Sequence, residues 1–488
     1  TLTTGKPVLD ANGKLQSLDV TKGSITIEGQ GLDGSQSDAV SIIARATEIN
    51  AALHAKDLKV IAGANRVSAS GETTALKGEG DAPKIAVDTG ALGGMYANRI
   101  HLVSSEKGLG VNLGNLNARQ GDITLDTNGK LTVNNSLASG AMTAKGQDIA
   151  LSGDHKAGGN VSVSSQDAIA LNNATLVSDK NIQLSANGRL TQNGGKLTAG
   201  QNLTANAQTL TQNSVAQADA AGNIALTSSE SIATLGSVIA GKQLNVVGKS
   251  LSNSGQWSAE DAASIKGSSL SNSGVVQGKS LAIAADQDVR VTGRLNAADS
   301  LKINAKSVTT AASAQVQSGN DLTLTTVIAS LSGTHAANNQ FTVAANTLTH
   351  DGKSNARTVY LNAPDNIANN GTLVADSLNL TSQRITNSGL MQGNAALNLH
   401  TGELTNLIGG SLYSIAALTL DIPSLTNRGL ITTDGNLRLG GSSLVNAGEI
   451  NGISMQNDYA TVTNDAAGRL LAGNALSISG QHLDNAGL

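Results

Sequence analysis

The chain has 488 residues, a net charge of −4 from 32 basic and 36 acidic side chains, and no cysteine. These values exclude disulfides and thiolate metal sites, and no apolar run reaches the roughly 18 residues of a membrane-spanning helix. One Trp, four Tyr and one Phe also exclude a core built around large rings, so the interior must be filled by Leu, Ile, Val and Ala.

Residues 1–120 repeat less regularly than the rest of the chain. At one place in this stretch the apolar side chains fit two periods. The spacing of a helix face is seen at Ile42, Ala46, Ile49 and Leu53. The alternation of a strand is seen at Val40, Ile42, Ala44 and Ala46. The residues alone leave both possibilities open.

Residues 121–488 carry a repeat of about 20 residues. Each copy has an apolar-x-apolar segment, followed about seven residues later by apolar-x-Asn-x-Gly; Leu437-Arg-Leu439, for example, precedes Leu444-Val-Asn-Ala-Gly448. The first apolar residue of each copy serves as a marker, and plausible earlier markers are Ile123, Met142, Val161 and Ile182. The regular series of markers is Leu203, Ile224, Leu244, Ala263, Leu281, Leu301, Leu322, Phe341, Val359, Leu378, Leu397, Leu418, Leu437, Met455 and Leu476.

This repeat predicts an all-β solenoid. The 14 steps from Leu203 to Leu476 average about 19.5 residues, which is enough for three short strands and three turns. One copy cannot bury its own apolar face, but stacked copies bury a continuous aliphatic core with coils about 4.8 Å apart. We therefore expect a parallel β-helix of about 20 residues per coil and roughly 25 coils.

An asparagine recurs at one phase of the repeat. A ladder that binds a ligand is one interpretation. The other, which we favour, is a turn residue whose amide bonds to the equivalent residue one coil away, because a repeated structural position needs a repeated structural cause. The residues assigned to this structural ladder are Asn253, Asn272, Asn387, Asn406, Asn427, Asn446, Asn464 and Asn485.

Two segments resemble phosphate-binding loops. Gly236-Ser-Val-Ile-Ala-Gly-Lys242 is followed by Gln243 where the motif needs Ser or Thr, and Gly274-Val-Val-Gln-Gly-Lys-Ser280 is one residue short. Neither precedes a helical pattern. The sequence therefore predicts no nucleotide cofactor.

Metal sites are also not predicted. Asp10-Ala-Asn-Gly13 and Asp126-Thr-Asn-Gly129 lack the later Glu of a calcium loop, so we interpret both as tight turns. No two of the seven histidines have the spacing of a metal-binding pair. His350 falls at the phase of the ladder asparagines and is expected to replace one of them. No catalytic residue is assigned.

The N-terminal stretch resembles the secretion domain of two-partner secretion exoproteins. The resemblance rests on Leu2-Thr-Thr-Gly5, Val60-Ile-Ala-Gly-Ala-Asn65, Gly93-Gly-Met-Tyr-Ala-Asn-Arg-Ile100 and Glu106-Lys-Gly-Leu-Gly-Val111. The repeats that follow are similar to the first repeat region of filamentous haemagglutinins and of contact-dependent growth-inhibition effectors, the CdiA family.

The resemblance has several implications for fold and function. It implies a right-handed β-helix, with strands rather than a helix at residues 40–55. It divides the chain into residues 1–120, the C-terminal part of the secretion domain, and residues 121–488, the haemagglutinin-type repeats. The Asn-Pro-Asn motifs that lead that domain are missing, so the chain is expected to begin partway through it. The implied location is the bacterial outer-membrane surface or the extracellular space.

The implied partners are an outer-membrane two-partner secretion transporter and, through regions outside the chain, a receptor on a target cell. We expect no nucleic acid, small-molecule substrate or cofactor. The predicted function is that of a structural shaft that projects a distal receptor-binding or toxin region, and not that of an enzyme. Two alternatives are kept: an adhesin that binds cells directly through its surface, and a β-helical enzyme that degrades polysaccharides, for which the expected cluster of Asp, Lys and Arg in adjacent coils is not seen.

Overall fold

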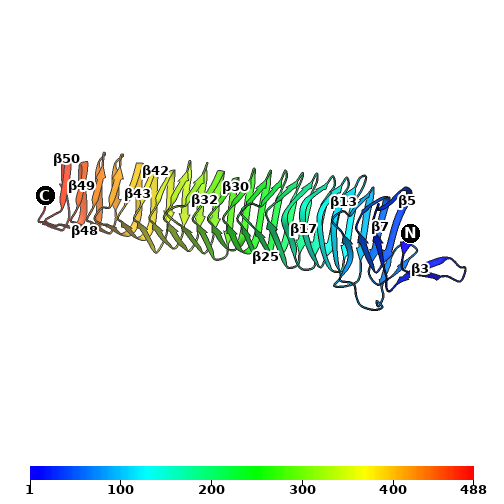
Figure 1. Ribbon diagram of the computed structural model, residues 1–488. Helices are drawn as coiled ribbons and strands as arrows, with labels where there is room; N and C mark the ends of the chain where they lie inside the picture. Colours follow the sequence, from blue (N-terminus) through cyan, green and yellow to red (C-terminus); the bar gives the residue numbers. More distant parts are fainter. The chain divides into compact units, whose positions relative to one another are not determined.

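The computed structural model describes all 488 residues, and its ordered elements are all strands. It divides into two compact units, Thr1–Lys249 and Ser250–Leu488. Each unit is a solenoid of parallel strands, and the chain makes about 24 turns roughly 19 residues apart. Figure 1 shows how consecutive turns lie side by side within each unit. The predicted all-β solenoid is therefore confirmed, with a turn count close to the expected 25.

One turn of the first unit shows how the sequence forms a coil. β23 (Leu203–Gln212) supplies two sides and β24 (Gln217–Ala220) supplies the third. Leu203 on the first side, Leu210 on the second and Ala218 on the third are buried, and polar neighbours between them point outward. In later coils the sides merge into longer strands, such as β42 (Thr372–Asn387) and β43 (Leu390–Asn406), which pair along their whole length.

The predicted phase of the repeat is confirmed by the strand register. Marker residues on the first side pair directly with the marker of the next coil in three long series. The first unit has the series Ile123, Met142, Val161, Ile182, Leu203 and Ile224. The second unit has the series Ala263, Leu281, Leu301, Leu322, Phe341, Val359, Leu378 and Leu397, and then Leu418, Leu437, Met455 and Leu476.

The core of each unit is aliphatic, as expected from the composition. Leu397 and Leu399 are buried on the first side, and Asn398 between them is exposed. The few large rings that lie inside are Trp257, Phe341 and Tyr459. Their burial agrees with a narrow interior in which one ring takes the place of an aliphatic side chain.

The third side ends in a column of small residues that the sequence analysis did not identify. An added Cβ at Gly393, which lies in this column, would be 2.1 Å from the carbonyl oxygen of Ala396 in the following turn. The chain is crowded where it turns back to the first side, and this explains the small side chains. In the first unit the aligned members are Ala118, Ala138, Ala157, Ser178, Ala199 and Ala220.

The N-terminal stretch consists of strands, as the resemblance implied. β5 (Leu32–Ala44) and β7 (Ala52–Ala62) pair in parallel as consecutive coils, with Val40 opposite Leu58. The helical alternative for this segment is therefore wrong. The alternation ends at Ile43 and Ile61, which are buried although their neighbours in the strand are buried too.

A small antiparallel sheet, which we call the side sheet, packs beside these first coils. It consists of β2 (Lys6–Leu9), β3 (Leu15–Val20), β8 (Asn65–Ser68) and β9 (Thr73–Ala75). Figure 1 shows the hairpin of β3 at the N-terminal end, away from the coils. This sheet could not be predicted from the sequence, because its strands are short and lie far apart in the chain.

Candidate functional site

The predicted ladder asparagines occupy one position at the end of the second side. Six of the eight form a continuous column in the second unit, with register partners in successive coils. This column contains Asn387, Asn406, Asn427, Asn446, Asn464 and Asn485. All but the last are buried, because each side chain points into the coil at the corner before the third side.

Within the column the amides are hydrogen-bonded in one direction. The Nδ2 of each asparagine donates to the Oδ1 of the next, at distances of 2.7–2.9 Å. Asn427 is representative. Its Nδ2 also donates to the carbonyl of Gly429 in the same turn and to that of Glu449 one coil on, both at 3.2 Å. The amide therefore satisfies backbone carbonyls at a corner where strand pairing is interrupted.

The other two predicted members form a separate pair. Asn253 Nδ2 donates to Asn272 Oδ1 at 2.8 Å, and Asn272 Nδ2 donates to carbonyls of its own turn and of the next coil, at 3.2 Å each. Val291 follows Asn272 in register and ends the pair. The eight asparagines thus lie in two runs and not in a single ladder.

Two kinds of ladder residue were missed from sequence. Asn369 precedes Asn387 in register and donates to its Oδ1 at 2.8 Å; the signal was present, since Ile367-Ala-Asn-Asn-Gly371 has the same motif. In the first unit Gln192 and Gln212 occupy the equivalent position at the end of the second side, and Gln212 Nε2 donates to Gln192 Oε1 at 3.2 Å. A search for Asn alone could not find these glutamines. His350 does occupy the ladder position next to Asn369, as expected.

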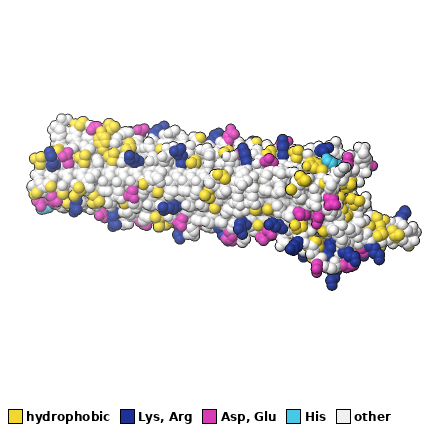
Figure 2. Space-filling model, viewed as in Figure 1, with side chains coloured by type: hydrophobic (Ala, Val, Ile, Leu, Met, Phe, Trp, Pro, Cys, Tyr) yellow, Lys and Arg dark blue, Asp and Glu magenta, His cyan; other side chains and the backbone are white.

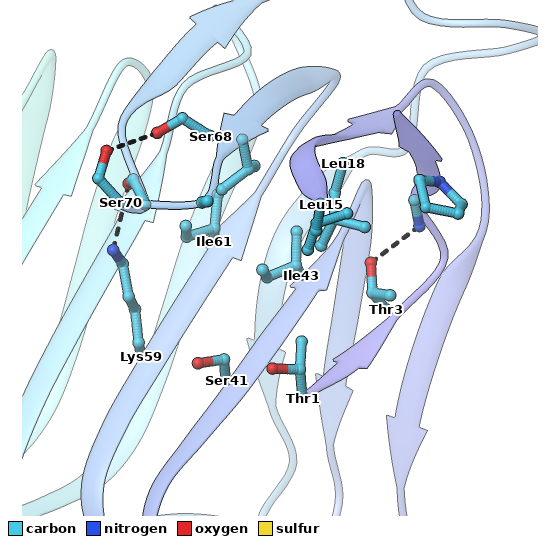
Figure 3. A pocket seen from close by; sticks show the side chains of 15 residues that line it. Thr1, Thr3, Leu15, Leu18, Ser41, Ile43, Lys59, Ile61, Ser68 and Ser70 are labelled. Carbon is cyan, nitrogen blue, oxygen red and sulfur yellow. Dashed lines mark hydrogen bonds between the residues drawn. The ribbon is translucent and has the colours of Figure 1, made fainter. Parts of the chain in front are cut away.

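A groove lies between the first coils and the side sheet. Figure 3 shows its apolar floor, where Ile43 and Ile61 on the outer face of the coils lie opposite Leu15 and Leu18 of β3. The groove has a volume of about 580 Å³, and hydroxyl groups line its rim. At one end Lys59 Nζ donates to the carbonyl of Gly71 at 3.1 Å. Figure 2 shows hydrophobic side chains gathered at the N-terminal end of the first unit, where the first coils and the side sheet lie.

A largely buried ion pair holds a loop of the N-terminal stretch. Arg45 Nη2 lies 2.8 Å from Glu106 Oε1, and Arg45 Nη1 donates to the carbonyl of Glu79 at 2.7 Å. Glu106 also accepts a bond of 3.0 Å from the backbone nitrogen of Ala64. The hydrogen bonds from Arg45 hold the pKa of Glu106 below its usual range despite partial burial. Gly78 packs on the guanidinium, where an added Cβ would lie 2.2 Å from Nη2. The pair therefore fixes the loop at residues 76–84 to the coils.

The nucleotide-loop and calcium-loop lookalikes lie in ordinary coil segments and turns. Residues 236–242 contain β26 (Ser237–Ala240), and residues 274–280 enter β30 (Val275–Ala285). Asp10 Oδ1 accepts bonds from the backbone of Asn12 and Lys14 across the hairpin turn. No group of three or more His, Asp or Glu side chains is placed to share a metal ion, and no helix is long and apolar enough to cross a membrane.

Two family models match the chain. Residues 1–133 match the TPS secretion domain. Residues 125–173, 157–228, 217–293 and 439–488 match the haemagglutinin repeat. No solved structure gives a significant match.

Curated relatives resemble most of the chain. It is 42% identical to the 16S rRNA endonuclease CdiA of Enterobacter cloacae over 93% of this chain and 12% of that protein. It is 43% identical to Toxin CdiA of Escherichia coli over 99% of this chain and 18% of that protein. With the tRNA nuclease CdiA of Escherichia coli strain NC101 it shares 62% identity over 57% of this chain and 8% of that protein. The chain thus spans between 8 and 18% of the length of these relatives.

The family models, the identities and the stacked coils agree with one another. The TPS match covers the first coils with their side sheet, and the haemagglutinin-repeat matches cover the regular coils at residues 125–293 and 439–488. The chain therefore belongs to the two-partner secretion exoproteins that include CdiA and the filamentous haemagglutinins, as a TPS secretion domain followed by haemagglutinin repeats wound into a β-helical shaft.

Proposed function

We propose that this chain is a supporting shaft that carries a receptor-binding or toxin region of the same polypeptide from the producing cell toward a target cell. The observation that carries the proposal is the uniform register of the coils, in which the strands of each turn pair with those of the adjacent turns. The relatives are named as a toxin and as nucleases, and this chain corresponds to a small part of each. We therefore assign any such activity to regions outside this chain, in growth inhibition on contact or in adhesion.

Export through a dedicated outer-membrane transporter is the second part of the proposal. The TPS match over residues 1–133 supports this partner, and the outer-membrane surface is the corresponding location. In cells that make the exoprotein, removal of the transporter should keep it inside while its synthesis continues. Equal amounts outside cells with and without the transporter would contradict this part.

The shaft role is tested by removing whole coils from the full-length exoprotein. One deletion removes residues 378–417 and the other removes residues 182–223; each takes out two complete turns between marker positions. Each should shorten the stack by about 10 Å. We expect both deletions to reduce delivery of the distal region to target cells partially and to a similar degree, because both change only the length of the shaft.

The same pair of deletions separates the shaft from a direct adhesin. Both proteins are first shown to be folded and exposed on the cell surface. If one deletion abolished binding to target cells and the other did not, a local receptor site in the missing coils would replace the shaft model.

A further inference from the structure

The asparagine ladder of the second unit continues into a buried polar chain that includes two histidines. His350 in β39 (Thr347–His350) occupies the ladder position, and its Nδ1 lies 2.7 Å from Asn369 Oδ1. Its Nε2 lies 2.8 Å from the hydroxyl of Ser354 in β40 (Lys353–Asn362). That hydroxyl is 3.3 Å from Nδ1 of His335.

This series of hydrogen-bonded side chains ends at a threonine, one coil before His335. His335 in β37 (Thr334–Ala337) has its Nε2 3.0 Å from Thr310 Oγ1, and Thr310 Oγ1 accepts a bond of 3.1 Å from the backbone of Ser332. Thr310, His335, His350 and Ser354 are each at most 2% exposed. These hydrogen-bonded side chains are therefore shielded from solvent.

The direction of every hydrogen bond in this chain follows from its end at Asn369. Asn369 Nδ2 donates to Asn387 Oδ1 and to the carbonyl of Leu390, so Asn369 Oδ1 is free only to accept. His350 must then carry its proton on Nδ1 and accept at Nε2 from Ser354. The Ser354 oxygen in turn accepts from Nδ1–H of His335, whose Nε2 accepts from Thr310. Both rings are neutral, in the same tautomer.

A second proton on either ring has no place in this arrangement. If His350 were protonated, both His335 and His350 would donate to Ser354, and the buried Ser354 proton would lose its acceptor. The two rings are also close, with centroids 6.4 Å apart and planes tilted by 55°, and His335 is stacked on Phe341 at 5.9 Å. Burial lowers the pKa of His335 to about 3, and burial also lowers the pKa of His350, against the opposing effects of Asn369 and Asp351.

Few other charges face these rings. Asp351, in the turn after β39, acts on His350 alone. Lys353 and Arg357 of β40 are exposed on the outer face. The strands of Thr310, Phe341 and Asn369 contribute no charged side chain.

We infer that the coils from Thr310 to Asn369 form an acid-sensitive joint in the shaft, which opens locally on acidification while the coils of the asparagine ladder stay closed. The joint exists because these coils satisfy their buried corner with imidazoles, which take up a proton when exposed, whereas the later coils use amides, which do not. When the pH falls below the ordinary histidine pKa of about 6.5, the exposed histidines of the opened segment bind protons, whereas the buried histidines of the closed segment stay neutral. The opening equilibrium of this segment should then rise about tenfold for each pH unit and each histidine.

Hydrogen–deuterium exchange of the whole chain tests the joint. Exchange is followed from pH 7 to pH 4.5, after correction for the intrinsic pH dependence of amide exchange. Protection of residues 328–373 should fall steeply, whereas protection of residues 425–464 should stay nearly constant. A parallel loss of protection in both segments would overturn the inference.

Variants and tautomers provide the controls. The double variant His335→Leu, His350→Asn should lose the acid response, and His400→Asn, at an exposed histidine of β43, should keep it. Full acid sensitivity in a folded double variant would refute the joint. If the double variant does not fold, the ¹⁵N chemical shifts of the histidine rings in the unaltered protein test the inference. At pH 7 we expect His335 and His350 to be the Nδ1–H tautomer. The Nε2–H tautomer at both rings would overturn the inference.

Discussion

At the scale of single residues, the ladder position shows how one side chain meets two demands. It must fill a buried corner, and it must supply donors for carbonyls that strand pairing leaves unpaired. Asparagine does both because its carboxamide donates along the column and to the turn at once. In the first unit Gln192 and Gln212, each with one more methylene, donate to carbonyls of the next coil, and Gln212 also donates back to Gln192.

Replacement of a ladder asparagine tests this structural role. Asn427→Ala should lower the free energy of unfolding by about 1–3 kcal/mol, because it leaves buried carbonyls without donors. The matched control is Asn398→Ala, at an exposed amide that donates only to Asn379, for which we expect at most about 0.5 kcal/mol. Chemical denaturation measures both. Equal effects would mean that burial at the corner is unimportant.

The inward position of Leu399 can be tested in the same strand. Leu399→Asp places an unpaired charge between stacked coils and should cost several kcal/mol, roughly 3 or more. Asn398→Asp, one residue away on the outer face, should change thermal unfolding very little. The two variants carry the same new charge, so a similar loss of stability in both would contradict the assigned register.

Most ladder residues could be predicted from sequence because apolar-x-Asn-x-Gly is a local motif that recurs at a constant phase. The two glutamines and the histidine–serine chain could not. Apart from the bond between His350 and Ser354, their bonds join residues 19 to 25 positions apart, and no local pattern marks them. Their function as hydrogen-bonding groups depends on burial, which only the stacked coils create.

At the scale of elements, the side sheet is the part of the fold that the sequence did not predict. β3 pairs with β8 across more than 40 residues, and each strand is short. Alternation identifies a strand but does not identify its partner. In the coils the partner is always the next repeat, so pairing followed from the period; in the side sheet no period exists.

The Arg45–Glu106 pair should control the loop at residues 76–84. Arg45→Ala leaves Glu106 partly buried without its partner. Removal of one partner of a buried ion pair typically lowers the free energy of unfolding by about 3–5 kcal/mol. We expect faster hydrogen exchange at residues 72–86 and unchanged exchange in the coils after residue 140. Arg99→Ala, which removes an exposed pair with Asp57, is the control and should leave the loop protected.

The same pair predicts a pH dependence of the loop. The pKa of Glu106 is lower in the folded state, so its contribution to stability is present above the unfolded value of about 4.3 and is lost as the pH falls through the folded value. Exchange at residues 72–86 should therefore rise only below about pH 4.3. A rise that begins at pH 6 would point to a histidine instead.

At the scale of the whole molecule, the contacts of each coil are local. Deletion of residues 378–417 joins equivalent positions and leaves the ladder in phase, with Asn369 followed by Asn427. We expect a folded protein with a β-sheet circular dichroism spectrum and a cooperative thermal transition. Deletion of residues 378–407, ten residues fewer, joins the first side to the wrong part of the coil. That variant should be much less stable, and equal stability would show that the register is not required.

The one-way ladder also has a mechanical consequence. If the isolated second unit were pulled from Leu488, each turn would detach as a step, and about 19 residues would extend by roughly 65 Å. In the ladder coils every step breaks the same set of amide bonds, so the rupture forces should be nearly equal. Beyond Asn369 the bonds belong to imidazole and hydroxyl groups, and at low pH the force needed for the next steps should drop. The shaft would then yield under load at one known place.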